Sequence, residues 1–128
     1  MKLGYVIHYV PDVGATVAFY EKAFGLAPRF IHDSGTYAEM ETGATALAFA
    51  SETMVADQGA AFRRTRPDDT PPGMEIALVT DDVRAAYARA VAAGAVALMP
   101  PKEKPWGQLV GYVRDLNGAL VELCSPMS

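Results

Sequence analysis

The chain has 128 residues, 51% of them hydrophobic and 20% charged, with one cysteine and a formal net charge of −4 at pH 7. This composition excludes a disordered chain, a disulfide framework or paired-cysteine motif and a nucleic-acid surface, because phosphate binding needs clustered lysine and arginine. No apolar run is long enough to cross a membrane and the sequence does not open on a signal peptide, so we expect a compact cytoplasmic protein that does not bind membranes.

The first half of the sequence predicts a strand, a helix and three further strands. Residues 4–10 are β-branched and aromatic, as strand residues often are. Asp12 is a suitable N-cap, and apolar residues then recur at helical spacing until Gly25, which marks the helix end. The three further strands, separated by short turns, are predicted at residues 27–32, 37–41 and 44–50.

The second half repeats this order. Residues 74–80 predict a strand, Asp82 repeats the capping position of Asp12, and Gly94 ends the second helical pattern. The remaining strands are predicted at residues 96–99, 109–114 and 119–123.

The repeat predicts two βαβββ modules, at residues 1–52 and 74–128. Residues 53–73 are richer in polar residues, proline and glycine, and form the connection, with a short helix expected around residues 56–62. Neither module is large enough to be stable alone. We therefore expect one α+β domain in which the two modules form a curved eight-stranded sheet around a cleft, with the helices outside. Such a cleft is the natural place for a functional site.

Two stretches carry a family resemblance that spans residues 4–126. The first runs from Tyr5 to Asp12 and continues to Phe24-Gly25-Leu26, and the second runs from Tyr112 to Leu123. With these motifs the chain resembles the vicinal oxygen chelate superfamily, which includes glyoxalase I, extradiol dioxygenases and bleomycin-resistance proteins. The resemblance implies the paired-module fold and a homodimer. It leaves the activity open, because one fold hosts many functions.

The resemblance also implies a metal site, with one ligand on each of four strands: His or Gln, Glu, His and Glu. Carried over position by position, these ligands fall on Tyr5, Ala48, Glu75 and Glu122. Only the two glutamates are carboxylate ligands, and a catalytic site normally has three protein ligands. We therefore expect no obligatory metal, and the alternative is a divalent ion (Mn, Mg, Fe, Ni or Zn) held by Glu75 and Glu122.

Alternation of side chains between the two faces of a strand predicts which residues line the cleft. They are Tyr5, Tyr9, Tyr37, Glu39, Ala48, Glu75, Tyr112 and Glu122, with Trp106 on a loop above them. The same alternation places His8 on the helix side, as a core histidine. Aromatic walls with carboxylates suit an aromatic or cationic organic ligand. If Glu75 and Glu122 lie close together, one of them has a raised pKa and can act as a general acid or base.

These observations predict a glyoxalase/bleomycin-resistance-like protein that binds a small aromatic or cationic molecule without an obligatory metal. One alternative is a divalent-metal-dependent lyase or dioxygenase-like enzyme that uses Glu75 and Glu122. A second alternative is a metal-free enzyme in which the same two residues supply acid and base. Whether the modules pair within one chain or are exchanged between two chains is left open.

Overall fold

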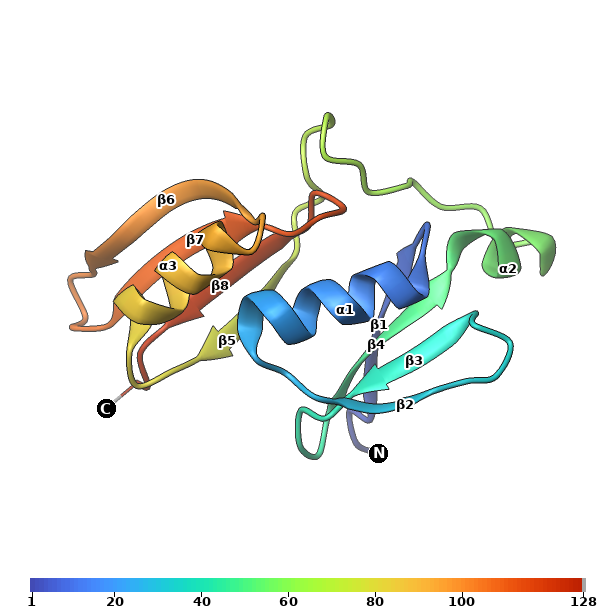
Figure 1. Ribbon diagram of the computed structural model, residues 1–128, viewed down its shortest axis with the longest axis horizontal. Helices are drawn as coiled ribbons and strands as arrows, with labels where there is room; N and C mark the ends of the chain where they lie inside the picture. The colour runs from blue at the N-terminus through green and yellow to red at the C-terminus, as the bar shows by residue number, and fades with distance from the viewer. Residues whose placement is uncertain (128) are drawn as a thin grey trace. The chain divides into compact units, whose positions relative to one another are not determined.

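The computed structural model describes residues 1–127, which divide between Thr65 and Arg66 into two compact units. Each unit carries a four-stranded mixed sheet and a helix of ten or twelve residues (Figure 1). The division falls inside the predicted connection, residues 53–73. The predicted α+β class and the two βαβββ modules are confirmed. No helix of the described chain is long and apolar enough to span a bilayer.

The first unit follows the predicted order of elements. These are β1 (Tyr5–Val10), α1 (Val13–Phe24), β2 (Pro28–Ile31), β3 (Tyr37–Met40), β4 (Ala46–Ser51) and α2 (Glu52–Asp57). Within the sheet the strand order is β1-β4-β3-β2, with β1 parallel to β4 and the other pairs antiparallel.

Helix α1 covers one face of this sheet. The Asp12 carboxylate accepts a hydrogen bond from the Ala15 N–H at 2.9 Å, and Gly25 ends the helix in the left-handed conformation at φ 69°. The ring of Tyr20, on α1, packs 4.9 Å from the ring of Phe49, on β4, and both are fully buried. Because side chains alternate along β4, Ala48 lies on the opposite, open face, together with the residues that pair with it on β1 and β3.

The second unit repeats this architecture. Its elements are β5 (Glu75–Val79), α3 (Val83–Ala92), β6 (Val96–Glu103), β7 (Leu109–Arg114) and β8 (Leu120–Cys124). Its strand order is β5-β8-β7-β6, with β5 parallel to β8. Asp82 caps α3 through the Ala85 N–H at 3.0 Å, as Asp12 caps α1. A side chain at Gly111 of β7 would lie 3.2 Å from the Tyr87 ring, so this glycine lets α3 pack closely on the sheet.

Two elements differ from the prediction. Strand β6 does not end at Met99 but continues through Pro100 and Pro101 to Glu103, because it is an edge strand, where proline leaves no ladder hydrogen bond unmade. Its register shifts between Ala97 and Met99 and again between Met99 and Lys102.

The short helix of the connection also lies earlier than residues 56–62. The Ser51 hydroxyl accepts a hydrogen bond from the Met54 N–H at 3.3 Å, so α2 begins directly after β4 and ends at Asp57. Phe62 is not helical. Its ring instead packs edge-to-face on Tyr9 at 5.0 Å.

Arg114 ties the start of the second unit to the turn between β7 and β8. Its guanidinium donates to the carbonyl oxygens of Gly118 (2.9 Å), Arg66 (3.2 Å) and Asp69 (2.7 Å). The Asp115 carboxylate shapes the same turn by accepting from the N–H groups of Asn117 and Ala119, both at 2.9 Å. This turn therefore anchors the extended segment that precedes β5.

Candidate functional site

The open face of the second sheet brings together four polar or ionisable side chains. Helix α3 covers the face that carries Gly111, so Glu75, Tyr112, Glu122 and Cys124 share the other face. In the register of the sheet, Glu122 of the central strand β8 lies directly opposite Tyr112 of β7. We call these four residues the carboxyl cluster.

Glu122 is the centre of the carboxyl cluster. The Tyr112 hydroxyl donates a hydrogen bond to Glu122 Oε1 at 3.0 Å. Glu75 and Cys124 lie near enough to Glu122 for its side chain to influence both of them. The Cys124 thiol also donates to the Leu78 carbonyl oxygen, with 3.8 Å between the sulfur and the oxygen. Two neighbouring carboxyl groups favour protonation of one of them, because the proton removes the repulsion between two negative charges.

The pKa values of the cluster follow from this arrangement. Desolvation, and then the hydrogen bond and negative charge of Glu122, raise the pKa of Glu75 above its ordinary value. The same causes raise the pKa of Tyr112 to about 12 and that of the Cys124 thiol to about 11. Tyr112 and Cys124 are therefore neutral donors at pH 7, and Glu75 is the carboxyl group of the cluster whose protonated form is favoured.

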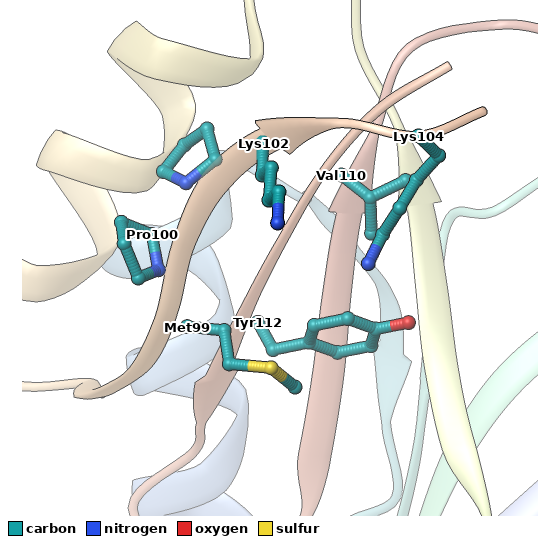
Figure 2. A pocket seen from close by; sticks show the side chains of 7 residues that line it. Met99, Pro100, Lys102, Lys104, Val110 and Tyr112 are labelled. Carbon is teal, nitrogen blue, oxygen red and sulfur yellow. The ribbon is translucent and has the colours of Figure 1, made fainter. Parts of the chain in front are cut away.

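A cavity of about 350 Å³ adjoins this cluster, with Tyr112 common to both. Its lining is Met99, Pro100, Pro101, Lys102, Lys104, Val110 and Tyr112. Figure 2 shows the two lysine side chains reaching from the β6 side toward the Tyr112 ring, with Met99 beside that ring. The cavity thus combines apolar walls and an aromatic ring with two ammonium groups.

Sequence reasoning missed the contribution of β6 to this cavity. Met99 pairs with Tyr112 and Lys102 with Val110, so the shifted register returns Lys102 to the open face. A predicted strand that ends before Pro100 and Pro101 leaves out Lys102 and Lys104. The sequence did contain one indication: proline is compatible with an edge strand, so the strand could have been continued past the prolines toward the two lysines.

The residues predicted from the first unit form a separate group on the open face of its own sheet. The Tyr37 hydroxyl donates to Glu39 Oε2 at 2.8 Å, and Glu39 Oε1 lies 3.5 Å from Arg29 Nη1. Glu39 is only 8% exposed, and Ala48 lies opposite it in the sheet. Desolvation and the hydrogen bond to Glu39 raise the pKa of Tyr37 to about 12. Arg29 was missed because it lies in the irregular stretch of β2 between Pro28 and Phe30.

The other predicted residues have different surroundings. Tyr5 is 58% exposed, and Tyr9 packs on Phe62. Trp106 is 62% exposed in the turn between β6 and β7, where its indole N–H donates to Gln108 Oε1 at 2.9 Å, and it does not line the 350 Å³ cavity. His8 Nε2 lies 3.2 Å from Thr65 Oγ1, so this half-buried ring has the hydrogen-bond partner that a structural histidine needs.

The donor set does not fit the four-ligand metal site that the resemblance implies. Ala48 has no donor atom, and Glu75 and Glu122 are the only carboxylates among the four positions. Within residues 1–127, no three or more histidine, cysteine, aspartate or glutamate side chains form a group that could hold a metal ion. Binding of a divalent ion by Glu75 and Glu122 alone stays a prediction.

Comparison with known proteins connects this fold to one superfamily. The family model described as Glyoxalase/Bleomycin resistance protein/Dioxygenase superfamily matches residues 2–123. A glyoxalase-related enzyme from Fulvimarina pelagi is similar in structure, with a TM-score of 0.82, 24% identity, and coverage of 98% of this chain and 88% of that one.

Two further solved structures each cover 98% of this chain and are covered to 98% themselves. TioX from Micromonospora sp. ML1 has a TM-score of 0.74 and 22% identity. A glyoxalase/bleomycin resistance protein/dioxygenase family enzyme from Burkholderia phytofirmans PsJN has a TM-score of 0.77 and 20% identity. At these identities the likeness shows the shared fold. The search of curated proteins gave no match.

Proposed function

Since the chain belongs to the glyoxalase/bleomycin resistance/dioxygenase superfamily, we propose that it binds a small aromatic molecule in the cavity of its second unit and needs no metal ion to do so. The observation that carries this proposal is the cavity itself, about 350 Å³ in volume and bordered by the Tyr112 ring. Small-molecule sites are concave, mostly apolar and of roughly 300–1,000 Å³.

The size and walls of the cavity suit a compact aromatic compound. An apolar cavity of about 150 Å³ holds benzene, so this one has room for a substituted or two-ring compound. The hydrogen bond from Tyr112 to Glu122 fixes the ring before a ligand arrives, which lowers the entropy cost of binding. The thioether of Met99 adds a polarisable contact that favours aromatic rings.

The residues that line the cavity also favour one of the two ligand classes, aromatic or cationic, between which the sequence did not decide. Lys102 and Lys104 line the cavity, whereas Glu75 and Glu122 do not. A cationic ligand would meet two like charges at short range before it reached a carboxylate. Of the two classes, the cavity supports the aromatic one.

Filling the cavity tests this proposal. We expect Met99→Trp to weaken binding of a neutral aromatic probe, 2-naphthalenemethanol, by about tenfold or more in titration calorimetry, because the indole occupies the space that the probe needs. Leu98→Trp is the matched control, since Leu98 is 45% exposed, Met99 is 48% exposed, and only Met99 lines the cavity. Binding should be unchanged by EDTA. Equal affinity in both variants would contradict the proposal, and binding that EDTA removes and Mn²⁺ restores would favour the metal-dependent alternative.

One observation favours a second candidate, a metal-free acid/base enzyme. Glu75, whose pKa is raised, shares the open face of the sheet with Tyr112, which lines the cavity. A carboxyl group with a raised pKa is a suitable general acid or base near neutral pH. An enzyme of this kind would keep its catalytic turnover in the presence of EDTA.

The raised pKa of Glu75 has its own test in the pH dependence of stability. The folded-state pKa of Glu75 is raised above 4.5, so its favourable contribution is complete below that pH and is lost as the pH rises through the raised value. Glu75→Gln avoids this loss. We expect the free energy of unfolding of the variant to exceed that of the wild type at pH 7. The difference should be less than about 1 kcal/mol, because the position is solvent-exposed. The two proteins should not differ in this way at pH 4. Urea unfolding at both pH values measures this difference, and Glu103→Gln is the control on exposed β6. An equal difference at pH 4 and pH 7 would refute the raised pKa of Glu75.

A further inference from the structure

Building on the proposed function, we propose that the aromatic ligand carries an acidic group, and that Lys102 and Lys104 bind this group at the β6 side of the cavity. The cavity would then select aromatic carboxylates over neutral and cationic aromatic compounds of the same shape. The volume of the cavity alone does not determine this class of ligand, whereas the two lysines favour an acidic one.

The first support is that both ammonium groups lack a protein partner. Within residues 1–127, neither Lys102 nor Lys104 makes an ion pair or a side-chain hydrogen bond. Both side chains nevertheless line the cavity and reach toward the Tyr112 ring (Figure 2). Two unneutralised positive charges beside one cavity favour an anion in that space.

The second support is that the backbone fixes both lysines. Lys102 lies opposite Val110 in the β6–β7 ladder. The Lys104 N–H donates to the Gln108 carbonyl oxygen at 2.8 Å, and the Lys104 carbonyl accepts from the Gly107 N–H, also at 2.8 Å. The two side chains therefore start from set positions, which reduces the entropy lost when they close on an anion.

The third support is the direction of the charge across the cavity. The Tyr112 hydroxyl donates its proton to Glu122, so the carboxyl cluster lies beyond that end of the ring. An acidic substituent is repelled by the carboxyl cluster and attracted to the lysines, while the planar body of the ligand can lie on Tyr112 and Met99.

Three naphthalene probes of similar shape test the inference by titration calorimetry at pH 7 and low salt. We expect 2-naphthoate to bind at least about tenfold more tightly than neutral 2-naphthalenemethanol, and 2-naphthylmethylammonium to bind most weakly. This preference should shrink as salt is added. In the Lys102→Met/Lys104→Met double variant, the preference for naphthoate over the alcohol should be lost, so that the two probes bind with about equal affinity.

Two controls accompany the double variant. Lys2→Met removes an exposed lysine of the first unit and should leave the preference intact. Lys102→Arg/Lys104→Arg keeps both charges and should retain most of the preference, and circular dichroism shows whether each variant is folded.

The outcomes separate this inference from the proposed function. If the alcohol binds the wild type as tightly as naphthoate, or the methionine variant keeps the preference, the acidic group is refuted and the aromatic site stands. Tightest binding of the ammonium probe would also refute the inference. If none of the three probes binds, the proposed function itself fails.

Discussion

Gly118→Ala is expected to destabilise the second unit strongly, by several kcal/mol, whereas Gly107→Ala costs less. Gly118 and Gly107 both have positive φ, 93° and 92°, so an alanine is strained at either position, by about 1–3 kcal/mol. The surroundings differ. A Cβ at Gly118 would lie 2.5 Å from the Arg66 carbonyl oxygen and 2.7 Å from Arg114 Nη2, whereas a Cβ at Gly107 has nothing within 4 Å.

The extra cost at Gly118 comes from separating the turn and the segment that Arg114 holds together. Crowding of this kind adds about 1–3 kcal/mol to the backbone strain. Urea unfolding followed by circular dichroism measures both variants, and because the φ angles match, their difference isolates the crowding. Equal stability of the two variants would show that Arg66 moves away at no cost, and would contradict the anchoring role given to Arg114.

The second large effect is expected in the chemistry of Cys124. With a pKa of about 11, against 9.0 for an ordinary thiol, and only 3% of its surface exposed, Cys124 should react with iodoacetamide at least about a hundredfold more slowly at pH 8 than an unperturbed thiol, because the thiolate is the nucleophile and the reagent must reach it. The direction follows from the sign of the shift: a raised pKa keeps the thiol protonated until the pH approaches 11. Its rate should therefore rise about tenfold per pH unit between pH 8 and 10.

Two further samples show where the shift comes from. The urea-unfolded chain should react as an ordinary thiol does. In Glu122→Gln the rate should rise, but should not reach that of the unfolded chain, because desolvation is the largest cause of the shift and the charge and hydrogen bond of Glu122 come after it. A rate in the folded wild type that levels off below pH 9 would contradict the raised pKa.

Local signals predicted most of the fold. The helix starts at Asp12 and Asp82 are set by side chains that cap the neighbouring N–H groups, and such signals can be read from sequence. Strand β7 occupies residues 109–114, as predicted. The end of β6 could not be placed, because a proline stops a strand only where its N–H would be needed, and this depends on the strand being at an edge.

The candidate site was predictable where alternation is regular and not where it is broken. Glu75, Glu122 and Tyr112 were placed on one face by alternation, and the structure has them there. Lys102 and Arg29 were missed because each lies at a register shift, where counting by two gives the wrong face. That Glu75 of the two carboxyl groups would have the raised pKa depends on burial and distances that a sequence does not contain.

The irregular edges of the two sheets have a consequence for solubility. Strand β2 forms one edge of the first sheet and β6 the corresponding edge of the second, and each combines proline with a shift in register. An edge strand with regular, unpaired backbone groups can recruit strands of other molecules into a growing sheet, and proline and bulges interrupt that process. Pro28, Pro100 and Pro101 carry no backbone N–H, so each leaves its edge with one donor fewer for an incoming strand.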